Sequence, residues 1–156
     1  MTIRPGDRLF VDTNILLAAT DRSRTTHEAA RTLIEQAGGA GWHLHINGQV
    51  VREYLAVATR PVDGNGLGLK AENALANIEQ LLGRMTLLAE TERVNRELLS
   101  LVASGELSGK RIHDAGIAAT MIAHGVALLI TDNLRDFRVF PNLRALAPSQ
   151  ATYALD

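Results

Sequence analysis

The sequence predicts an α/β fold, a three-layer sandwich in which helices flank a central and mostly parallel sheet. Short apolar runs bounded by polar turn residues predict strands buried on both faces, and residues 9–11 and 128–130 are the clearest of them. Segments with the apolar spacing of amphipathic helices alternate with these runs. Strands that alternate with helices in this way are typical of a parallel sheet covered on both sides.

Helices and strands alternate through the first half of the chain. After the strand at 9–11, residues 14–19 are expected to form a short helix with Asp12 or Thr13 in its capping region. A second helix should begin at Thr25 or Thr26 and end at Gly38 and Gly39. The alternating residues 42–46 predict a strand that leads into a helix over 49–59. Residues 60–68 are rich in turn formers and should form an exposed, mobile loop.

The second half of the chain repeats this alternation. Apolar spacing predicts helices over 70–82 and 92–104, with a short strand over 85–88 between them. An alanine-rich helix over 112–124 carries Asp114 and should end at Gly125. Its small residues, Gly116 among them, would allow a close approach to the sheet. The strand at 127–130 follows, and residues 143–146 are expected to add an edge strand.

Length and composition limit the possible functions. The 156 residues suit one domain over 1–156. Because there is no cysteine, disulfides, thiolate metal sites and cysteine nucleophiles are excluded. The formal net charge of -1 lacks the basic excess that marks many nucleic-acid binders, so any contact with phosphate must be local. No leader and no apolar run of about 20 residues is found, so we expect a cytoplasmic protein with no membrane contact.

Acidic residues stand at the ends of the predicted strands. Asp12 and Asp132 directly follow the two clearest strands, and ligands of open α/β sheets bind at the carboxyl ends of strands. Singly, each acid has an ordinary explanation. Asp12 and Asp114 could cap or begin helices, Asp132 could belong to a simple turn, and Glu53 could be an exposed helical residue.

The surroundings of Glu53 favour a shared site. Apolar residues cover most of the circumference of its predicted helix, and a charge there is costly unless it is paired or bound to a metal. Two carboxylates about 4 Å apart repel by roughly 4 kcal/mol at an effective dielectric constant near 20, so four converging acids would need a cation. With oxygen ligands alone, Mg²⁺ or Mn²⁺ suits such a site better than zinc or copper.

Histidines and common catalytic motifs offer weaker candidates. His43 and His45 would share one strand face, but no third ligand at metal spacing accompanies them, and core or surface roles are favoured. His113 adjoins Asp114 and could orient it or contact phosphate. The chain has no Gly-x-Ser-x-Gly elbow, and neither a phosphate-binding loop ending in Lys-Ser/Thr nor a dinucleotide-binding glycine motif follows a strand.

Four stretches of the chain, in this order and spacing, resemble the PIN-domain family and, more narrowly, the VapC-type toxins of bacterial toxin-antitoxin pairs. They are residues 10–16, the helical Glu53, residues 112–118 and residues 131–137. The resemblance implies a PIN-like nuclease domain and an endoribonuclease dependent on Mg²⁺ or Mn²⁺. It also implies an RNA substrate, a homodimer and inhibition by a cognate antitoxin.

The resemblance also implies roles for particular residues. Asp12 and Asp114 match the principal metal ligands, and Glu53 matches the acid on the third helix. Many relatives carry a fourth acid two residues after the threonine of the last strand, where this chain has Asn133. Asp132 is our preferred fourth ligand and catalytic acid, with Asn133 and Asp136 as its partners. The residues expected to position the substrate are Thr13, Asn14, Thr131, Asn133, Asp136 and Arg111.

The leading hypothesis is therefore a metal-dependent ribonuclease that acts as a toxin. One alternative is a PIN-like module that binds RNA or protein without cleaving it. The retention of a full set of mutually repelling acids argues against that alternative. Another is a PIN nuclease of RNA or DNA processing that is not a toxin, and nothing in the chain separates it from the leading hypothesis.

Overall fold

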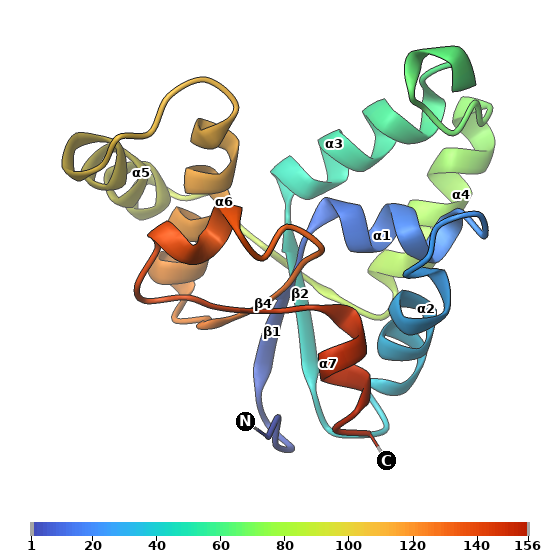
Figure 1. Ribbon diagram of the computed structural model, residues 1–156, viewed down its shortest axis with the longest axis horizontal. Coiled ribbons are helices and arrows are strands. Elements are labelled where there is room, and N and C mark those ends of the chain that lie inside the picture. The colour runs from blue at the N-terminus through green and yellow to red at the C-terminus, as the bar shows by residue number, and fades with distance from the viewer. Residues whose placement is uncertain (1, 156) are drawn as a thin grey trace.

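Five parallel strands form one sheet at the centre of the computed structural model, which describes residues 2–155 (Figure 1). The strands are β1 (Arg8–Val11), β2 (His43–Asn47), β3 (Thr86–Leu88), β4 (Leu128–Ile130) and β5 (Arg144–Leu146). Their order in the sheet is β3-β2-β1-β4-β5, and all four pairings are parallel. The parallel sheet predicted from the sequence is confirmed.

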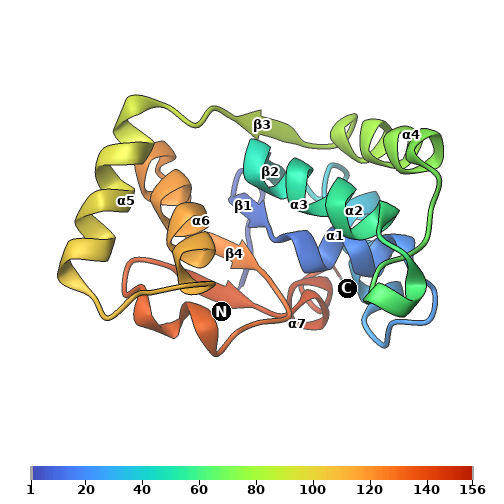
Figure 2. The ribbon, with the colours of Figure 1, turned by 90° about the horizontal axis from the view of Figure 1, so that it is seen from above.

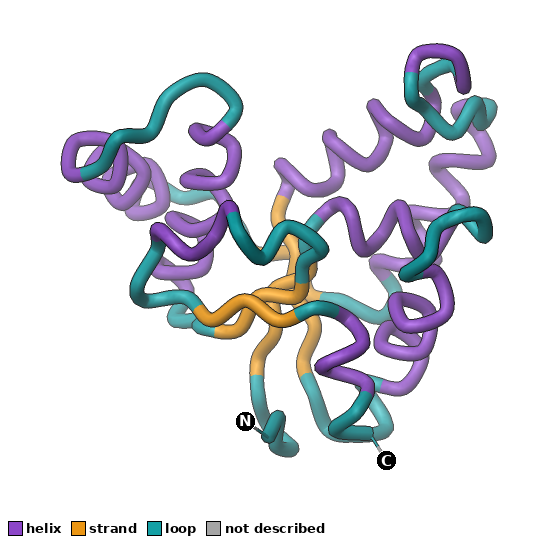
Figure 3. The backbone as a smooth tube through the Cα atoms, in the orientation of Figure 1, coloured by secondary structure: helices purple, strands orange, loops and turns teal. Residues whose placement is uncertain are grey.

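Helices cover the sheet on both sides. They are α1 (Thr13–Thr20), α2 (His27–Gln36), α3 (Gly48–Thr59), α4 (Ala71–Leu82), α5 (Glu92–Ser104), α6 (Arg111–His124) and α7 (Pro148–Thr152). In Figures 1 and 2, α5 and α6 lie on one side of the sheet, and α1, α2, α3, α4 and α7 lie on the other. Figure 3 shows the strands enclosed between these two groups, so the three-layer sandwich is confirmed. Within residues 2–155, no helix combines the length and the apolar character needed to cross a membrane.

The core forms where β1 runs through the middle of the sheet. Leu9, Phe10 and Val11 are fully buried, as expected for a strand covered on both faces. Side chains alternate between the two faces of neighbouring β2. Asn47 faces α6, where its amide donates a hydrogen bond of 2.9 Å to the Thr120 hydroxyl. His45 shares this face and is buried, in agreement with the alternation seen in the sequence.

The strand order reverses at β1. The chain leaves β1 toward β2 and β3 on one side, and β4 and β5 complete the sheet on the other. Ligands of open α/β sheets bind at such a switch point, outside the carboxyl ends of the strands. Val11 is in register with Ile130, and the backbone N–H of Asp12 donates to the Ile130 carbonyl oxygen at 3.0 Å. Asp12 and Thr131 therefore leave the sheet side by side.

Three short elements were not predicted from the sequence. Two are single 3-10 turns, η1 (Val62–Gly64) and η2 (Asp136–Val139), and the third is α7. The exposed loop after α3 contains η1 and folds back on the end of α3, because the backbone N–H of Leu67 donates to the carbonyl oxygen of Val57. The turn η2 carries Asp136 close to the beginning of α6, which bears on the site described next.

Candidate active site at the carboxyl ends of β1 and β4

Asp12 is the most buried acid of the site, with only 6% of its surface exposed. It is the N-cap of α1, where its Oδ1 accepts a hydrogen bond of 2.7 Å from the backbone N–H of Thr13. Its Oδ2 accepts one of 2.7 Å from the Thr131 hydroxyl and one of 3.1 Å from the Asn14 amide. Both carboxylate oxygens are thus held in fixed directions by neutral donors.

The environment of Asp12 disfavours its negative charge. The pKa of Asp12 is raised from 3.8 to about 6, mainly by burial, and the charges of Glu53 and Asp114 contribute to this rise. Hydrogen bonds from Thr131 and Thr13 act in the opposite direction. No cationic side chain is among the groups that shift the pKa of Asp12. A bound cation would therefore favour the ionised form of its carboxylate most strongly.

Glu53 reaches the same site from α3. Its Oε2 accepts a hydrogen bond of 2.8 Å from the Thr13 hydroxyl, and its Oε1 accepts one of 2.9 Å from the Gln49 amide. The Nδ1 atom of His113 lies 4.0 Å from the same Oε1. One third of the Glu53 side chain remains exposed, so it faces both the buried Asp12 and the solvent.

Asp114 lies in the first turn of α6, and it is half-buried. Burial raises the pKa of Asp114, and the charges of Asp136 and Glu53 raise it further. The guanidinium of Arg111 and the neighbouring His113 lower it. The structure therefore brings Asp12, Glu53 and Asp114 within electrostatic range of one another, from β1, α3 and α6.

The two candidates for a fourth acid are placed differently. The backbone N–H of Asp132 donates to Asn14 Oδ1 at 3.1 Å, and its exposed carboxylate accepts a hydrogen bond of 3.2 Å from the Thr26 hydroxyl. The side chain of Asp132 is thus directed to the segment before α2. Asp136, on η2, is the acid whose charge acts on Asp114, and its backbone carbonyl accepts a hydrogen bond of 2.8 Å from Arg111.

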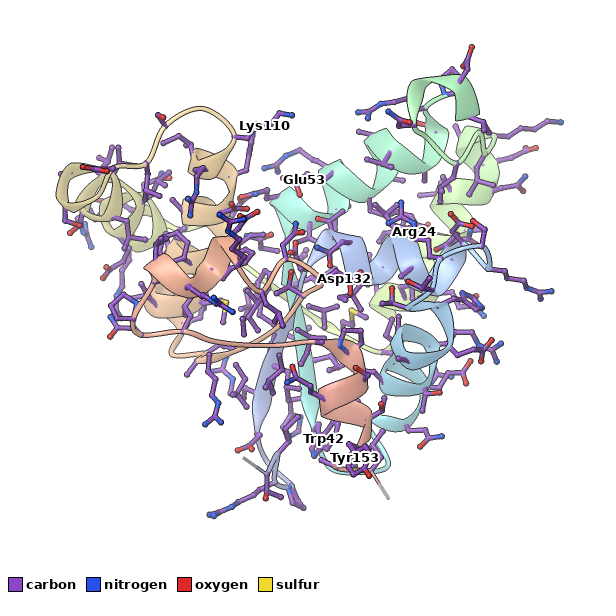
Figure 4. The ribbon with its side chains drawn as sticks, viewed as in Figure 1. Arg24, Trp42, Glu53, Lys110, Asp132 and Tyr153 are labelled. Atoms are coloured by element: carbon purple, nitrogen blue, oxygen red, sulfur yellow. The ribbon has the colours of Figure 1, made fainter. Side chains whose placement is uncertain are left out.

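The residues expected to position the substrate belong mainly to one hydrogen-bond network. Besides donating to Asp12, the Thr131 hydroxyl accepts hydrogen bonds from the Asn14 amide at 3.2 Å and from the Asn133 backbone N–H at 3.0 Å. Asn133 thus contributes its backbone to this network. Figure 4 shows Glu53 and Asp132 at the same end of the molecule as Lys110 and Arg24, with Trp42 and Tyr153 at the opposite end.

Gln49 was not predicted from the sequence as a site residue. Its side-chain amide donates a hydrogen bond to the carboxylate of Glu53. The only signal for it is the spacing of four residues, which places the two side chains on the same face of α3.

The chemistry of these side chains fits a hard divalent cation. Within residues 2–155, no three histidine or acidic side chains already stand close enough to form a metal-binding group. Asp12, Glu53 and Asp114 nevertheless supply only oxygen ligands, and two of them have raised pKa values because they are partly or fully buried beside other acids. Oxygen ligands of this kind suit Mg²⁺ or Mn²⁺.

Comparison with known proteins defines the class to which this fold and site belong. The PIN domain family model matches residues 9–143, and the chain belongs to the PIN-domain family. Among curated proteins, it is similar to ribonucleases VapC48 and VapC24 of Mycobacterium tuberculosis. VapC48 is 31% identical over 88% of this chain and 94% of its own length, and VapC24 is 31% identical over 90% and 96%.

A solved structure shares the same fold. The DNA-bound VapBC complex of Salmonella typhimurium contains a chain with a TM-score of 0.66 and 20% identity, over 91% of this chain and 98% of that one. The resemblance predicted from the sequence, including its narrower VapC-type form, is therefore confirmed.

Proposed function

We propose that this protein is an endoribonuclease that requires Mg²⁺ or Mn²⁺ and acts as the toxin of a toxin-antitoxin pair. The observation that supports it best is that buried Asp12 lies within electrostatic range of Glu53 and Asp114 near the switch point of the sheet. Two relatives that span nearly the whole chain are named ribonucleases, which supports RNA as the substrate. The full acid set favours cleavage over a binding role, because an inert scaffold gains nothing from acids that repel one another.

Asp12, Asp114 and Glu53 would hold the cation, and Asp136 is better placed than Asp132 to complete the set. When bound, the cation would lower the pKa of a coordinated water and neutralise charge on the scissile phosphate. The protein's own task is to keep the carboxylates oriented. Thr131 and Asn14 orient Asp12, whereas Thr13 orients Glu53. Glu53 is partly exposed, so its carboxylate is also accessible to water and would orient the attacking water by accepting a hydrogen bond from it.

Arg111 is the basic residue best placed to contact a phosphate. Its guanidinium lies near Asp114 and donates to the backbone of Asp136, so it borders the acids without neutralising Asp12. Arg24 is a second candidate, since it lines a shallow hollow together with Thr25, Thr26 and Asp132. RNA bound across the acids would thus meet positive charge on two sides.

We also propose an antitoxin protein as the partner, because the toxin of such a pair is inhibited by its antitoxin. The structural neighbours include the VapBC complex of Salmonella typhimurium and a toxin-antitoxin complex from Klebsiella pneumoniae. A homodimer is the second assembly we propose. Leu75, Leu87 and Leu99 are 50%, 53% and 69% exposed, and they lie on α4, the edge strand β3 and α5. Leu99 is the most exposed of the three, and because α4 and α5 lie on opposite sides of the sheet, we place the proposed interface on α5.

RNA cleavage by purified variants tests the proposed activity. Asp12→Asn and Asp114→Asn should each abolish cleavage of a panel of synthetic RNA hairpins and single strands in Mn²⁺, with the fold intact by circular dichroism. Asp63→Asn changes an exposed acid on η1 and serves as the matched control. Full activity in either site variant would overturn the proposal, and cleavage of DNA but not RNA would assign the chain to another class of nuclease.

A further inference from the structure

Gly116 on α6 leaves a space that the side chain of Gln49 occupies. A Cβ atom added at Gly116 would lie 2.6 Å from Gln49 Oε1, well inside van der Waals contact. The conflict involves the far end of a flexible side chain and no backbone atom. An alanine at position 116 would therefore displace the Gln49 amide and leave the helix in place.

The Gln49 amide joins two helices that carry acids of the site. Its Nε2 donates to Glu53 Oε1 at 2.9 Å and to the backbone carbonyl oxygen of His113 at 2.9 Å. Gln49 lies in the first turn of α3, and His113 directly precedes Asp114 at the beginning of α6. One amide group thus connects the carboxylate of Glu53 to the helix turn that presents Asp114.

With Gln49 in place, both oxygens of Glu53 have a donor. Thr13, on α1, donates to Oε2, and Gln49, four residues earlier on α3, donates to Oε1. A carboxylate fixed at one oxygen only can still rotate about its terminal bond, because that torsion is broad. Two donors, one to each oxygen, restrict this rotation and hold the carboxylate in one orientation.

We propose that Gln49 is a positioning residue for Glu53, and that Gly116 is required because it admits the Gln49 amide. The proposal builds on the metal-dependent nuclease site described above. Loss of a partner that orients a metal ligand commonly costs about 10- to 100-fold in metal affinity or activity. Gly116→Ala and Gln49→Ala are both expected to lower Mn²⁺ affinity and kcat by such a factor, while KM for RNA changes little.

Gly116→Ala separates positioning from stability. Alanine is a better helix former than glycine, so this variant should unfold at the same urea concentration as the wild type or a higher one. A purely structural role for Gly116 would instead lower the unfolding midpoint together with activity. Gly38→Ala is the matched control, because a Cβ there meets nothing within 4 Å.

A double-mutant cycle, followed by Mn²⁺ calorimetry and by RNA cleavage, provides the decisive test. Once Gln49 is alanine, Gly116→Ala should cause no further loss, since the side chain that it displaces is absent. Additive losses, or single variants within twofold of the wild type in both measurements, would overturn the proposal. If the wild type cleaves no RNA, the proposed function fails, and the Mn²⁺ affinities of the same four proteins still test the positioning role.

Discussion

The hydroxyl of Thr131 donates a hydrogen bond of 2.7 Å to Oδ2 of Asp12, across the junction of β4 and β1. Among the contacts of Asp12, it opposes the effect of burial on the pKa most strongly. Thr131 is itself fully buried and receives hydrogen bonds from Asn14 and Asn133, so its hydroxyl hydrogen is directed at Asp12. The strand order alone makes this contact possible, because residues 12 and 131 are 119 positions apart.

Replacing Thr131 with valine should move the pH dependence of cleavage. Valine has the same shape but no donor, so the pKa of Asp12 should rise above its present value of about 6. The acidic limb of the pH-activity profile is then expected to shift to higher pH, with a loss of about 10- to 100-fold near that limb. Thr131→Ser keeps the hydroxyl and should keep the wild-type profile. An unshifted limb in the valine variant would refute the role assigned to Thr131.

Asp12 should make the metal-free protein less stable as pH rises. Its pKa is about 6 in the fold against an ordinary 3.8, so between these values the folded state holds a proton that the unfolded state has lost. The free energy of unfolding should therefore fall by up to about 3 kcal/mol across this interval and stay level above it. Urea unfolding in EDTA at several pH values should show the wild type losing stability relative to Asp12→Asn as the pH rises. A difference independent of pH would contradict it.

The two possible fourth acids can be separated by matched amide substitutions. Asp136→Asn removes the charge that acts on Asp114, and we expect Mn²⁺ affinity to fall by about 10-fold or more. Asp132→Asn affects a carboxylate bound to Thr26 and should change the affinity little. Calorimetry on both variants decides between them. The reverse order of effects would restore Asp132 as the fourth ligand.

The proposed dimer predicts a change of mass on one substitution. Leu99 is 69% exposed on α5, and an aspartate there would place a charge inside the proposed interface. The wild type should show twice the 16.9 kDa chain mass by light scattering, and Leu99→Asp should show the mass of one chain. Tyr153→Asp alters an exposed residue at the opposite end from the site and serves as the control. A wild type of single-chain mass would rule out the dimer.

The layers of the fold could be predicted because each depends on a local pattern. Leu9, Phe10 and Val11 of β1 are fully buried and form an uninterrupted apolar run in the sequence. The glycine that ends α6, Gly125, adopts the left-handed conformation expected of a helix stop. Helix α7 was missed because its five residues are too few to show a period. Pro148 at its first turn was the available signal.

The details of the site depend on contacts between distant residues. The ends of strands and helices indicated Asp12 and Asp114, and the apolar surroundings of its predicted helix indicated Glu53. The structure places the three within electrostatic range of one another. The direction of the Asp132 side chain could not be foreseen. It follows from the hydrogen bond between its backbone and Asn14, and from the η2 turn that brings Asp136 toward α6. The Gln49 bridge likewise exists only because α3 and α6 begin next to each other.

Calorimetric titration of Mn²⁺ into the wild type and into Asp114→Asn tests the shared cation site most directly. Asp12, Glu53 and Asp114 belong to three different elements, so one ion that they bind together should respond to the loss of any one of them. We predict saturable binding to the wild type and a loss of at least about 10-fold in affinity in Asp114→Asn. Equal binding by the two proteins, or none by the wild type, would contradict the account.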